Sequence, residues 1–209
     1  MEGHVAQVWE KLECLWELRS FSQLDGDLRL DEGSLGSEAS VGLVCEIGFN
    51  FGASALFWLL TTNATVLSFD LGEHPYVRSA AGRLERQFPG RLLLVLGDSA
   101  RTVPRFAADH NITCDVIVVD GRHTFAGAME DLRQMARFAR PKSPEEPSAS
   151  ILILDDVGML ADINDAWQHA WNLAWIDHVR AVEGSSSPSS FRSNSGVALG
   201  HYRGNYLSE

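Results

Sequence analysis

Residues 42–70 read GLVCEIGFNFGASALFWLLTTNATVLSFD, and they show the architecture of the chain more clearly than any other stretch. An apolar run at 43–47 is followed by a turn with glycines at 48–52, a helical stretch at 53–61 and a second apolar run at 65–69. A strand, a crossover helix and a second strand in this order are the building block of a parallel sheet. The stretch therefore predicts a strand–helix–strand unit.

The same alternation of strands and helices continues along the chain. Further strands are predicted at 92–96, 115–119 and 151–154, and helices at 75–88, 99–110, 124–139 and 159–175. Short strands that are apolar throughout are typical of a parallel sheet buried on both faces. The last two runs, at 178–182 and 197–202, are joined only by a loop-like segment, which predicts an antiparallel hairpin. We therefore expect an α/β fold with helices on both faces of an open, mostly parallel sheet.

The first 41 residues differ from the rest of the chain. Apolar residues recur at helical spacing over 3–20, whereas 21–41 are polar and rich in Gly, Ser and Asp. We interpret residues 1–41 as a helix with a polar linker or cap over the active site, and residues 42–209 as one domain. The apolar face of the helix would either pack on this domain or mediate a homodimer.

Composition excludes several classes of protein. Of the 209 residues, 45% are hydrophobic and 22% are charged, which argues against a disordered chain, a collagen and a disulfide scaffold. The net charge of −11 disfavours nucleic acid as the main partner, because phosphate binding needs a basic surface. The sequence has no apolar run of about 20 residues and no signal-peptide pattern, so we expect no membrane association.

The three cysteines, Cys14, Cys45 and Cys114, form no CxxC pair. Cys45 and Cys114 each lie in an apolar run, and we expect both to be buried free thiols. Free thiols indicate a reducing compartment, so the expected location is cytoplasmic.

Acidic residues follow the predicted parallel strands, at the edge where ligands bind in open α/β sheets. They are Glu46, Asp70, Asp98, Asp120 and the pair Asp155 and Asp156. Since the carboxyl ends of parallel strands share one edge, we expect these acids to lie around a common site.

The turn after the first strand has the spacing G-x-x-x-G, with Asn50 where the dinucleotide-binding pattern GxGxxG has a glycine. Asn50 adds bulk where the backbone would approach a pyrophosphate, and Glu46 suits a cationic ligand better than an anionic one. Asp70 would either accept both hydroxyls of a ribose or cap the next helix. Asp98 with Ser99 would either hold an adenine or cap the helix that follows.

Five motifs follow one another at fitting spacing within about residues 42–157: CEIGFNFGASA, SFDLGEHPYV, LGDSARTVP, CDVIVVDGRHTFAGAMEDL and ILILDDV. Together they resemble a class I S-adenosylmethionine-dependent methyltransferase, of the small-molecule O-methyltransferase branch called methyltransferase family 24. The resemblance implies a Rossmann-like sheet of seven strands in the order 3-2-1-4-5-7-6, with the last strand antiparallel.

The resemblance also implies a binding site for S-adenosylmethionine. Asp70 would bind the ribose of this cofactor, and Asp98 and Ser99 would bind its adenine. Glu46, Gly48 and Gly52 are implied around the methionine part, and the other residues implied to bind the cofactor are Asn50, Ser54 and Asp120. Asn50 departs from the glycine that is commoner in the family.

A divalent cation is the second expected cofactor. Asp120, Asp155 and Asp156 end neighbouring strands, so their carboxylates would converge and repel one another unless a cation lies between them. Oxygen ligands suit Mg²⁺ or a similar ion. Catechol-type O-methyltransferases have a similar layout, with an amide where this chain has Asp156. The alternative is a site without metal, in which Asp120 contacts the cofactor or caps a helix and the Asp pair simply ends a strand.

His123 lies three residues after Asp120, where catechol-type enzymes have a lysine as the general base. Histidine exchanges protons near neutral pH, so His123 and Asp120 are the candidate catalytic residues. The alternative for His123 is a loop histidine with structural hydrogen bonds. Arg122 would either steer an anionic substrate or lie on a solvated surface.

The expected function is transfer of the S-adenosylmethionine methyl group to a hydroxyl of a small-molecule acceptor. Two alternatives remain: a methyltransferase-like binding module without turnover, and an NAD(P)-linked oxidoreductase, which the missing GxGxxG disfavours. Trp167, Trp171 and Trp175 form a helical stripe that is expected in the core, or else as an aromatic wall for the acceptor.

Overall fold

The computed structural model describes residues 41–143, 148–182 and 196–204. The expected helix over 3–20 and nearly all of the polar segment after it lie outside these residues. The interpretation of residues 1–41 as a linker, a cap or a dimer contact therefore stays a prediction. Among the described residues, no helix has the length and apolar character needed to cross a membrane.

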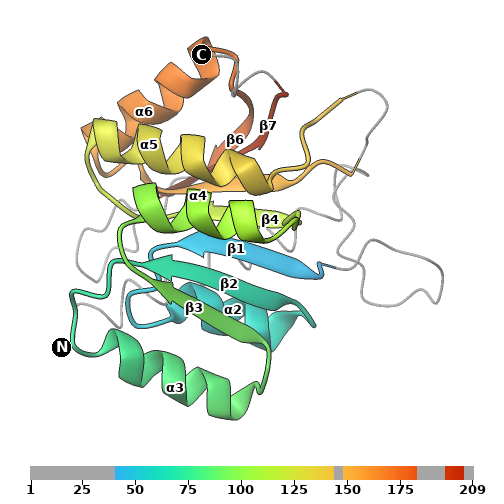
Figure 1. Ribbon diagram of the computed structural model, residues 1–209. Coiled ribbons are helices and arrows are strands. Elements are labelled where there is room, and N and C mark those ends of the chain that lie inside the picture. Colours follow the sequence, from blue (N-terminus) through green and yellow to red (C-terminus); the bar gives the residue numbers. More distant parts are fainter. Residues whose placement is uncertain (1–40, 144–147, 183–195, 205–209) are drawn as a thin grey trace.

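Seven strands form one sheet in the order β3-β2-β1-β4-β5-β7-β6 (Figure 1). The pairs among β1 to β5 are parallel, and β7 runs antiparallel to both of its neighbours. This confirms the fold class, the strand order and the antiparallel last strand. The strands are β1 (Leu43–Ile47), β2 (Thr65–Asp70), β3 (Leu92–Leu96), β4 (Val116–Val119), β5 (Ile151–Val157), β6 (Ile176–Val182) and β7 (Gly196–Tyr202).

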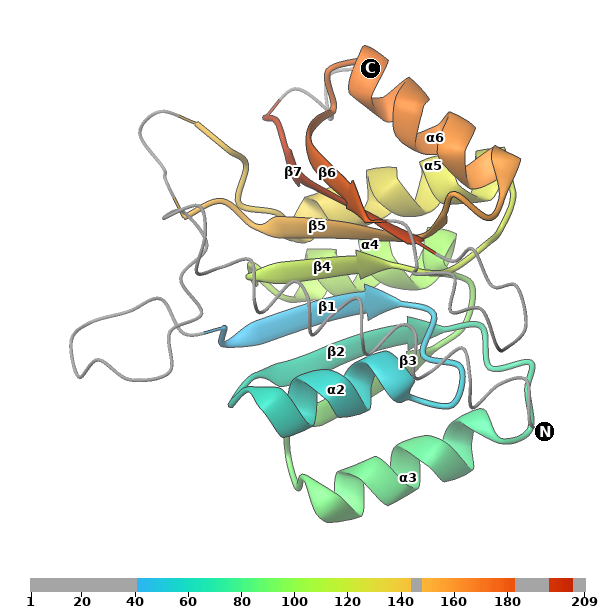
Figure 2. The ribbon, with the colours of Figure 1, turned by 180° about the vertical axis from the view of Figure 1, so that it is seen from behind.

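Helices cover both faces of the sheet. Helices α4, α5 and α6 lie on one face and α2 and α3 on the other, as the two opposite views show (Figures 1 and 2). The helices are α2 (Ala53–Thr61), α3 (Val77–Gln87), α4 (Ser99–Asp109), α5 (Phe125–Met135) with the short 3₁₀ helix η1 (Ala136–Phe138), and α6 (Ala161–Asn172). Each matches a predicted helix, with ends displaced by a few residues.

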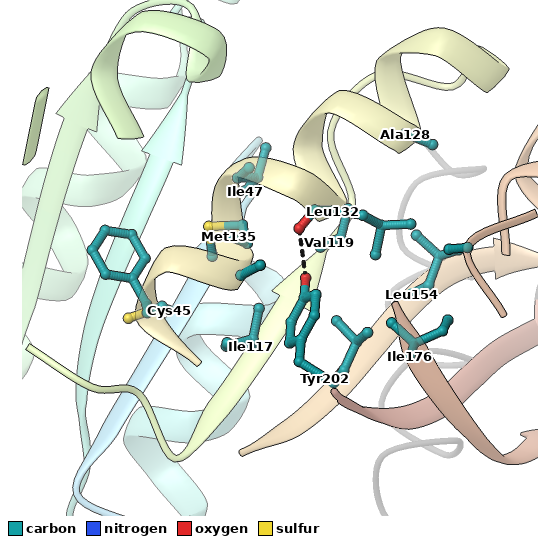
Figure 3. Close-up of a cluster of buried hydrophobic side chains, with 14 of the residues drawn as sticks. Cys45, Ile47, Ile117, Val119, Ala128, Leu132, Met135, Leu154, Ile176 and Tyr202 are labelled. Atoms are coloured by element: carbon teal, nitrogen blue, oxygen red, sulfur yellow. Dashed lines mark hydrogen bonds between the residues drawn. The ribbon is translucent and has the colours of Figure 1, made fainter. Parts of the chain in front are cut away.

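The core has two halves because successive side chains of a strand point to opposite faces. On β1, Cys45 and Ile47 pack into the cluster under α4, α5 and α6, whereas Val44 packs into the cluster under α2 and α3. Tyr202, at the end of β7, is fully buried in the first cluster, and its hydroxyl donates to the carbonyl oxygen of Leu132 at 2.9 Å (Figure 3). This contact attaches the last strand to α5.

The expectation of free thiols at Cys45 and Cys114 is wrong. The two residues form a disulfide, with Cα atoms 5.9 Å apart across 69 positions of sequence. Cys45 lies in β1 and Cys114 lies just before β4, the neighbouring strand, so sheet pairing brings them together. The expected strand order already made these strands neighbours, but it does not give the register that brings the two thiols together. The argument from free thiols to a cytoplasmic location therefore loses its premise.

The tryptophan stripe belongs only partly to the core. Trp167 is buried and its indole N–H donates to Nδ1 of His178 at 2.9 Å, whereas Trp171 is 44% exposed. Trp175 lies beyond the end of α6 and packs at the margin of the core. The end of α6 at Asn172 explains only the position of Trp175, because Trp171 lies within the helix and is still exposed.

Candidate functional site

A cleft of about 500 Å³ lies at the carboxyl edge of the parallel strands. Eight of the residues predicted for the site line it: Gly48, Asn50, Asp70, Asp98, Ser99, Asp120, His123 and Asp156. Four others, Glu46, Gly52, Ser54 and Asp155, are not part of its lining, and neither are the three tryptophans of the stripe. The cleft therefore gathers residues from the ends of five strands, as the topology requires.

The turn after β1 brings the backbone close to the loop after β4. Gly48 has φ +98°, and a Cβ atom on it would lie 1.9 Å from the carbonyl oxygen of Asp120. A residue with a side chain is therefore excluded at this position by both conformation and space. Asn50 has φ +51°, a conformation that asparagine tolerates, which explains how this turn forms without the usual glycine.

Asp70 links the ends of the first two strands. Its Oδ2 accepts from the backbone N–H of Asn50 at 2.8 Å, and its Oδ1 accepts from that of Gly72 at 2.7 Å. The side chain of Asn50 in turn accepts from the hydroxyl of Tyr76 at 2.8 Å. Asp70 does not cap α3, whose first cap residue is Tyr76. Each carboxylate oxygen has a further lone pair that can accept from a ligand in the cleft.

Asp98 caps α4 and also faces the cleft. Its Oδ1 accepts from the backbone N–H of Ala100 at 3.1 Å and from the guanidinium of Arg122 at 2.8 Å. The Arg122 side chain, expected to steer an anionic substrate, is therefore paired with an acid of the cleft itself. Both partners are substantially exposed, at 46% and 34%, so solvent screens this ion pair.

Asp131 is a site residue that the sequence analysis missed. It is 1% exposed, and it accepts from the Ser99 hydroxyl at 2.6 Å and from the backbone N–H of Arg122 at 3.2 Å. Burial raises the pKa of its carboxyl, although these two hydrogen bonds and the Arg122 charge oppose the shift. Its position between Ala128 and Met135, on the apolar face of α5, was a signal in the sequence, because an acid rarely occupies such a face without a partner.

Glu46 is buried beside the cleft, on the face of the sheet that carries α2. Neither of its carboxylate oxygens has a hydrogen bond of standard geometry to a described residue, and nor does the hydroxyl of its cross-strand neighbour Ser68. The pKa of Glu46 is raised to about 7, chiefly by burial; the nearby Ser54 and Ser68 hydroxyls oppose this rise, and the charges of Asp120 and Asp70 add to it.

Asp120, His123 and Asp156 form a compact group on one side of the cleft. Nε2 of His123 lies 3.5 Å from Oδ1 of Asp120 and 3.2 Å from Oδ2 of Asp156. One potential ligand atom from each of the three residues lies within 4.8 Å of the other two. Asp156 is the buried member and His123 the exposed one, so the group opens towards the cleft through the imidazole.

Asp155 is not in this group, contrary to the expected set of three aspartates. Its Oδ1 accepts from the backbone N–H of Asp156 at 2.8 Å. The end of β5 is irregular: the pairing with β7 shifts between Leu154 and Val157, and Asp156 has φ +61°. Adjacent side chains of a strand point to opposite faces, so the two aspartates are not expected to enter one group.

A comparison with known protein families gives one match. A family model for methyltransferase family 24, described as a methyltransferase domain, matches residues 45–157. No curated protein matches the sequence at a significant level.

Solved structures share the fold at low sequence identity. The O-methyltransferase TomG from Streptomyces achromogenes, in complex with S-adenosylmethionine, has a TM-score of 0.62 at 14% identity, with 79% of this chain and 74% of TomG covered. An O-methyltransferase from Bacillus cereus in complex with S-adenosylhomocysteine has a TM-score of 0.60 at 13% identity, with 78% and 74% covered. Fibrillarin from Aeropyrum pernix, with bound S-adenosylmethionine, has a TM-score of 0.57 at 12% identity, with 77% and 66% covered.

These likenesses show a shared fold among proteins with different names, so they leave the acceptor open. The family match spans more than half of the chain, and its residues carry the Gly48 turn, Asp70 and the Asp120 loop that build the cleft. The chain thus belongs to methyltransferase family 24, and with it to the class I S-adenosylmethionine-dependent methyltransferases.

Proposed function

We propose that this protein transfers the methyl group of S-adenosylmethionine to a hydroxyl oxygen of a small molecule. The observation that carries the proposal is that one cleft holds both a set of residues suited to the cofactor and a histidine between two aspartates. Transfer of a methyl group to a hydroxyl needs both parts, because the acceptor must lose a proton as its oxygen attacks.

The cofactor would lie along the strand ends from β1 to β3. Asp70 would accept the ribose hydroxyls through its remaining lone pairs, and the Gly48 turn would face the methionine part. The Ser99 hydroxyl donates to Asp131, so Ser99 would bind the adenine through its backbone N–H. That N–H lies in the first turn of α4, where backbone donors lack acceptors within the helix.

The other residues predicted to bind the cofactor divide into two sets. Asn50 and Asp120 line the cleft and could touch the cofactor. Glu46, Gly52 and Ser54 do not line it, so we propose that they support the turn rather than bind the cofactor directly. Gly52 does so as the N-cap of α2 in a left-handed conformation.

The bound cofactor supplies a sulfonium-activated methyl group, and the protein supplies orientation and a destination for the proton. The methyl carbon moves from sulfur to the acceptor oxygen, while the acceptor O–H bond breaks. The proton leaves in one of two ways. His123 Nε2 would take it directly, or Asp120 would hold a cation whose chemistry would be to lower the pKa of the hydroxyl, with water as the proton acceptor.

The acceptor is proposed to be a small molecule rather than a nucleic acid. The chain carries a net charge of −11, and the cleft itself is lined by five aspartates and Glu73 against a single arginine, which is paired with Asp98. A polyanion would be repelled from such an entrance. Met159, 39% exposed at the His123 side of the cleft, offers an apolar contact for an uncharged acceptor.

A thermal-shift titration with S-adenosylhomocysteine tests the proposal. At 100 times the Kd, a ligand stabilises a protein by about 2.7 kcal/mol, which corresponds to about 5–10 °C in Tm for a chain of this size. Asp70→Ala should remove the shift, whereas Asp109→Ala, at the end of α4 and outside the cleft, should retain it. A shift with NADH and none with S-adenosylhomocysteine would contradict the proposal, and cofactor binding without turnover on any hydroxyl acceptor would indicate a binding module.

A further inference from the structure

We propose that Asp120, His123 and Asp156 bind a divalent first-row transition-metal ion, with His123 as a direct ligand in place of Asp155. The inference rests on the proposed function, because the ion would lie in the same cleft and face the acceptor. It differs from the arrangement that the sequence suggests, in which three carboxylates provide only oxygen ligands.

The two distances from His123 to the aspartates suit a shared metal ion. Bonds from such an ion to histidine nitrogen and carboxylate oxygen are about 2.0–2.2 Å. Two ligand atoms at those bond lengths lie about 3.0 Å apart at a right angle and about 3.4 Å apart at a tetrahedral angle. The observed separations of His123 Nε2 from the two carboxylate oxygens, 3.2 and 3.5 Å, are close to these values.

The electrostatics of the group also favour a cation. Asp156 is 7% exposed and Asp120 is 20% exposed, and both carboxylates face one imidazole. Two partly buried carboxylates near each other are costly unless positive charge compensates them. A protonated imidazole would supply one charge, whereas a divalent ion would supply two and would leave the imidazole neutral, as a ligand must be.

Asp155 is the expected ligand that lies outside the close group. Its Oδ1 is directed to the backbone N–H of Asp156, at 2.8 Å, and it lies outside the set of ligand atoms that are mutually close. The adjacent aspartates therefore have different tasks: Asp156 faces the cleft, and Asp155 holds the backbone that presents Asp156.

A nitrogen ligand changes which ion the site prefers. Mg²⁺ and Ca²⁺ take oxygen ligands, whereas imidazole suits zinc, iron and nickel. Affinity for mixed sites also rises along the series from Mn²⁺ through Co²⁺ and Ni²⁺. We therefore expect Co²⁺ to bind more tightly than Mg²⁺, a preference that a site of three carboxylates would not show to the same degree.

Direct binding measurements on the full chain test this without reference to turnover. Protein freed of metal by a chelator is titrated with Co²⁺ and with Mg²⁺ by calorimetry, and the visible absorption of bound Co²⁺ reports nitrogen ligation. His123→Ala should weaken Co²⁺ binding by about 10–100-fold or more, since loss of a residue that only supports a ligand already has an effect of this size. Asp155→Asn keeps an acceptor for the Asp156 N–H and should change Co²⁺ binding by no more than about twofold. His169→Ala, a histidine of α6 that does not line the cleft, is the control for adventitious binding.

The reverse result, with Asp155→Asn weakening Co²⁺ binding and His123→Ala leaving it intact, would overturn the proposal in favour of the oxygen-only set. Equal affinity of the wild type for Co²⁺ and Mg²⁺ would also contradict it. If neither ion binds while S-adenosylhomocysteine still does, the metal site is wrong and the proposed function stands with His123 as the base. If the wild type does not bind S-adenosylhomocysteine, the proposed function itself is refuted.

Discussion

Glu46 is a buried acid whose surroundings change its protonation. It lies in β1 without a hydrogen bond of standard geometry to a described residue, and its pKa is raised from 4.5 to about 7. Between these two values the folded protein binds more protons than the unfolded chain, so its stability falls as pH rises from about 4.5 to about 7 and then levels off.

Glu46→Gln should remove this pH dependence. The raised pKa corresponds to about 3 kcal/mol, at 1.36 kcal/mol per unit, by which ionised Glu46 destabilises the protein above pH 7. The variant should therefore match the wild type near pH 4.5 and exceed it at pH 8. Urea unfolding at several pH values measures the difference, and parallel curves for both proteins would contradict the assigned burial.

Asp131 shows how one buried side chain holds two loops of the cleft. Its carboxylate accepts from Ser99 and from the Arg122 backbone, and a Cβ atom on Gly121 would lie 2.4 Å from its Oδ2. The loops after β3 and β4 thus meet at this residue.

Asp131→Asn should lower the free energy of unfolding by about 1–3 kcal/mol and weaken S-adenosylhomocysteine binding. The amide NH₂ group would face either the Ser99 hydroxyl or the Arg122 backbone N–H, and both of these are hydrogen-bond donors. Glu130→Gln is the matched control on the same helix, since Glu130 is partly exposed and pairs with Arg133 at the surface. Glu130→Gln should lower the free energy of unfolding by less than about 1 kcal/mol. Equal losses in chemical denaturation would show that Asp131 has no special place in the cleft.

At the scale of an element, the turn from β1 into α2 positions the cleft through close packing of backbone against backbone. Gly48 and Gly90 both have positive φ, +98° and +73°. They differ in space: a Cβ atom on Gly48 would collide with the Asp120 carbonyl, whereas one on Gly90 would meet nothing within 4 Å.

This pair of glycines separates conformational strain from steric exclusion. Gly90→Ala should lower the free energy of unfolding by about 1–2 kcal/mol, because alanine is strained in the left-handed conformation. Gly48→Ala should cost about 4 kcal/mol or more and should abolish S-adenosylhomocysteine binding, because the turn must also move away from Asp120. Similar losses in unfolding experiments on both variants would mean that the turn relaxes without harm.

At the scale of the whole molecule, the Cys45–Cys114 disulfide joins the centre of the sheet. It closes a loop of 69 positions between β1 and the segment that enters β4, and both cysteines are fully buried. A bond of this span stabilises a protein chiefly by restricting the unfolded chain.

Denatured, unreduced protein should therefore show one reactive thiol, that of Cys14, out of three cysteines in the sequence. Replacing Cys14 by serine should reduce the count to zero. Reduction should lower the free energy of unfolding by about 4 kcal/mol according to the loop-entropy relation. Three thiols in the wild type under non-reducing conditions would exclude the bond.

The sequence by itself determined the strands, the helices and the edge at which the cleft lies. Short apolar runs and helical periods are local properties, so β1 and β3 begin and end where the sequence predicts. The resemblance to methyltransferases then supplied the order of the strands, which the structure confirms. The acids at the strand ends were predictable as a group because parallel strands share one edge.

Only the tertiary structure decided which of these side chains meet. The disulfide depends on the pairing of β1 with β4, and the role of Asp131 depends on two loops that approach α5 from other strands. The close group of Asp120, His123 and Asp156 depends on how the loop after β4 lies against the end of β5. Side-chain direction and contacts between distant segments follow from packing of the whole chain, whereas the local pattern of residues specifies only the elements that are packed.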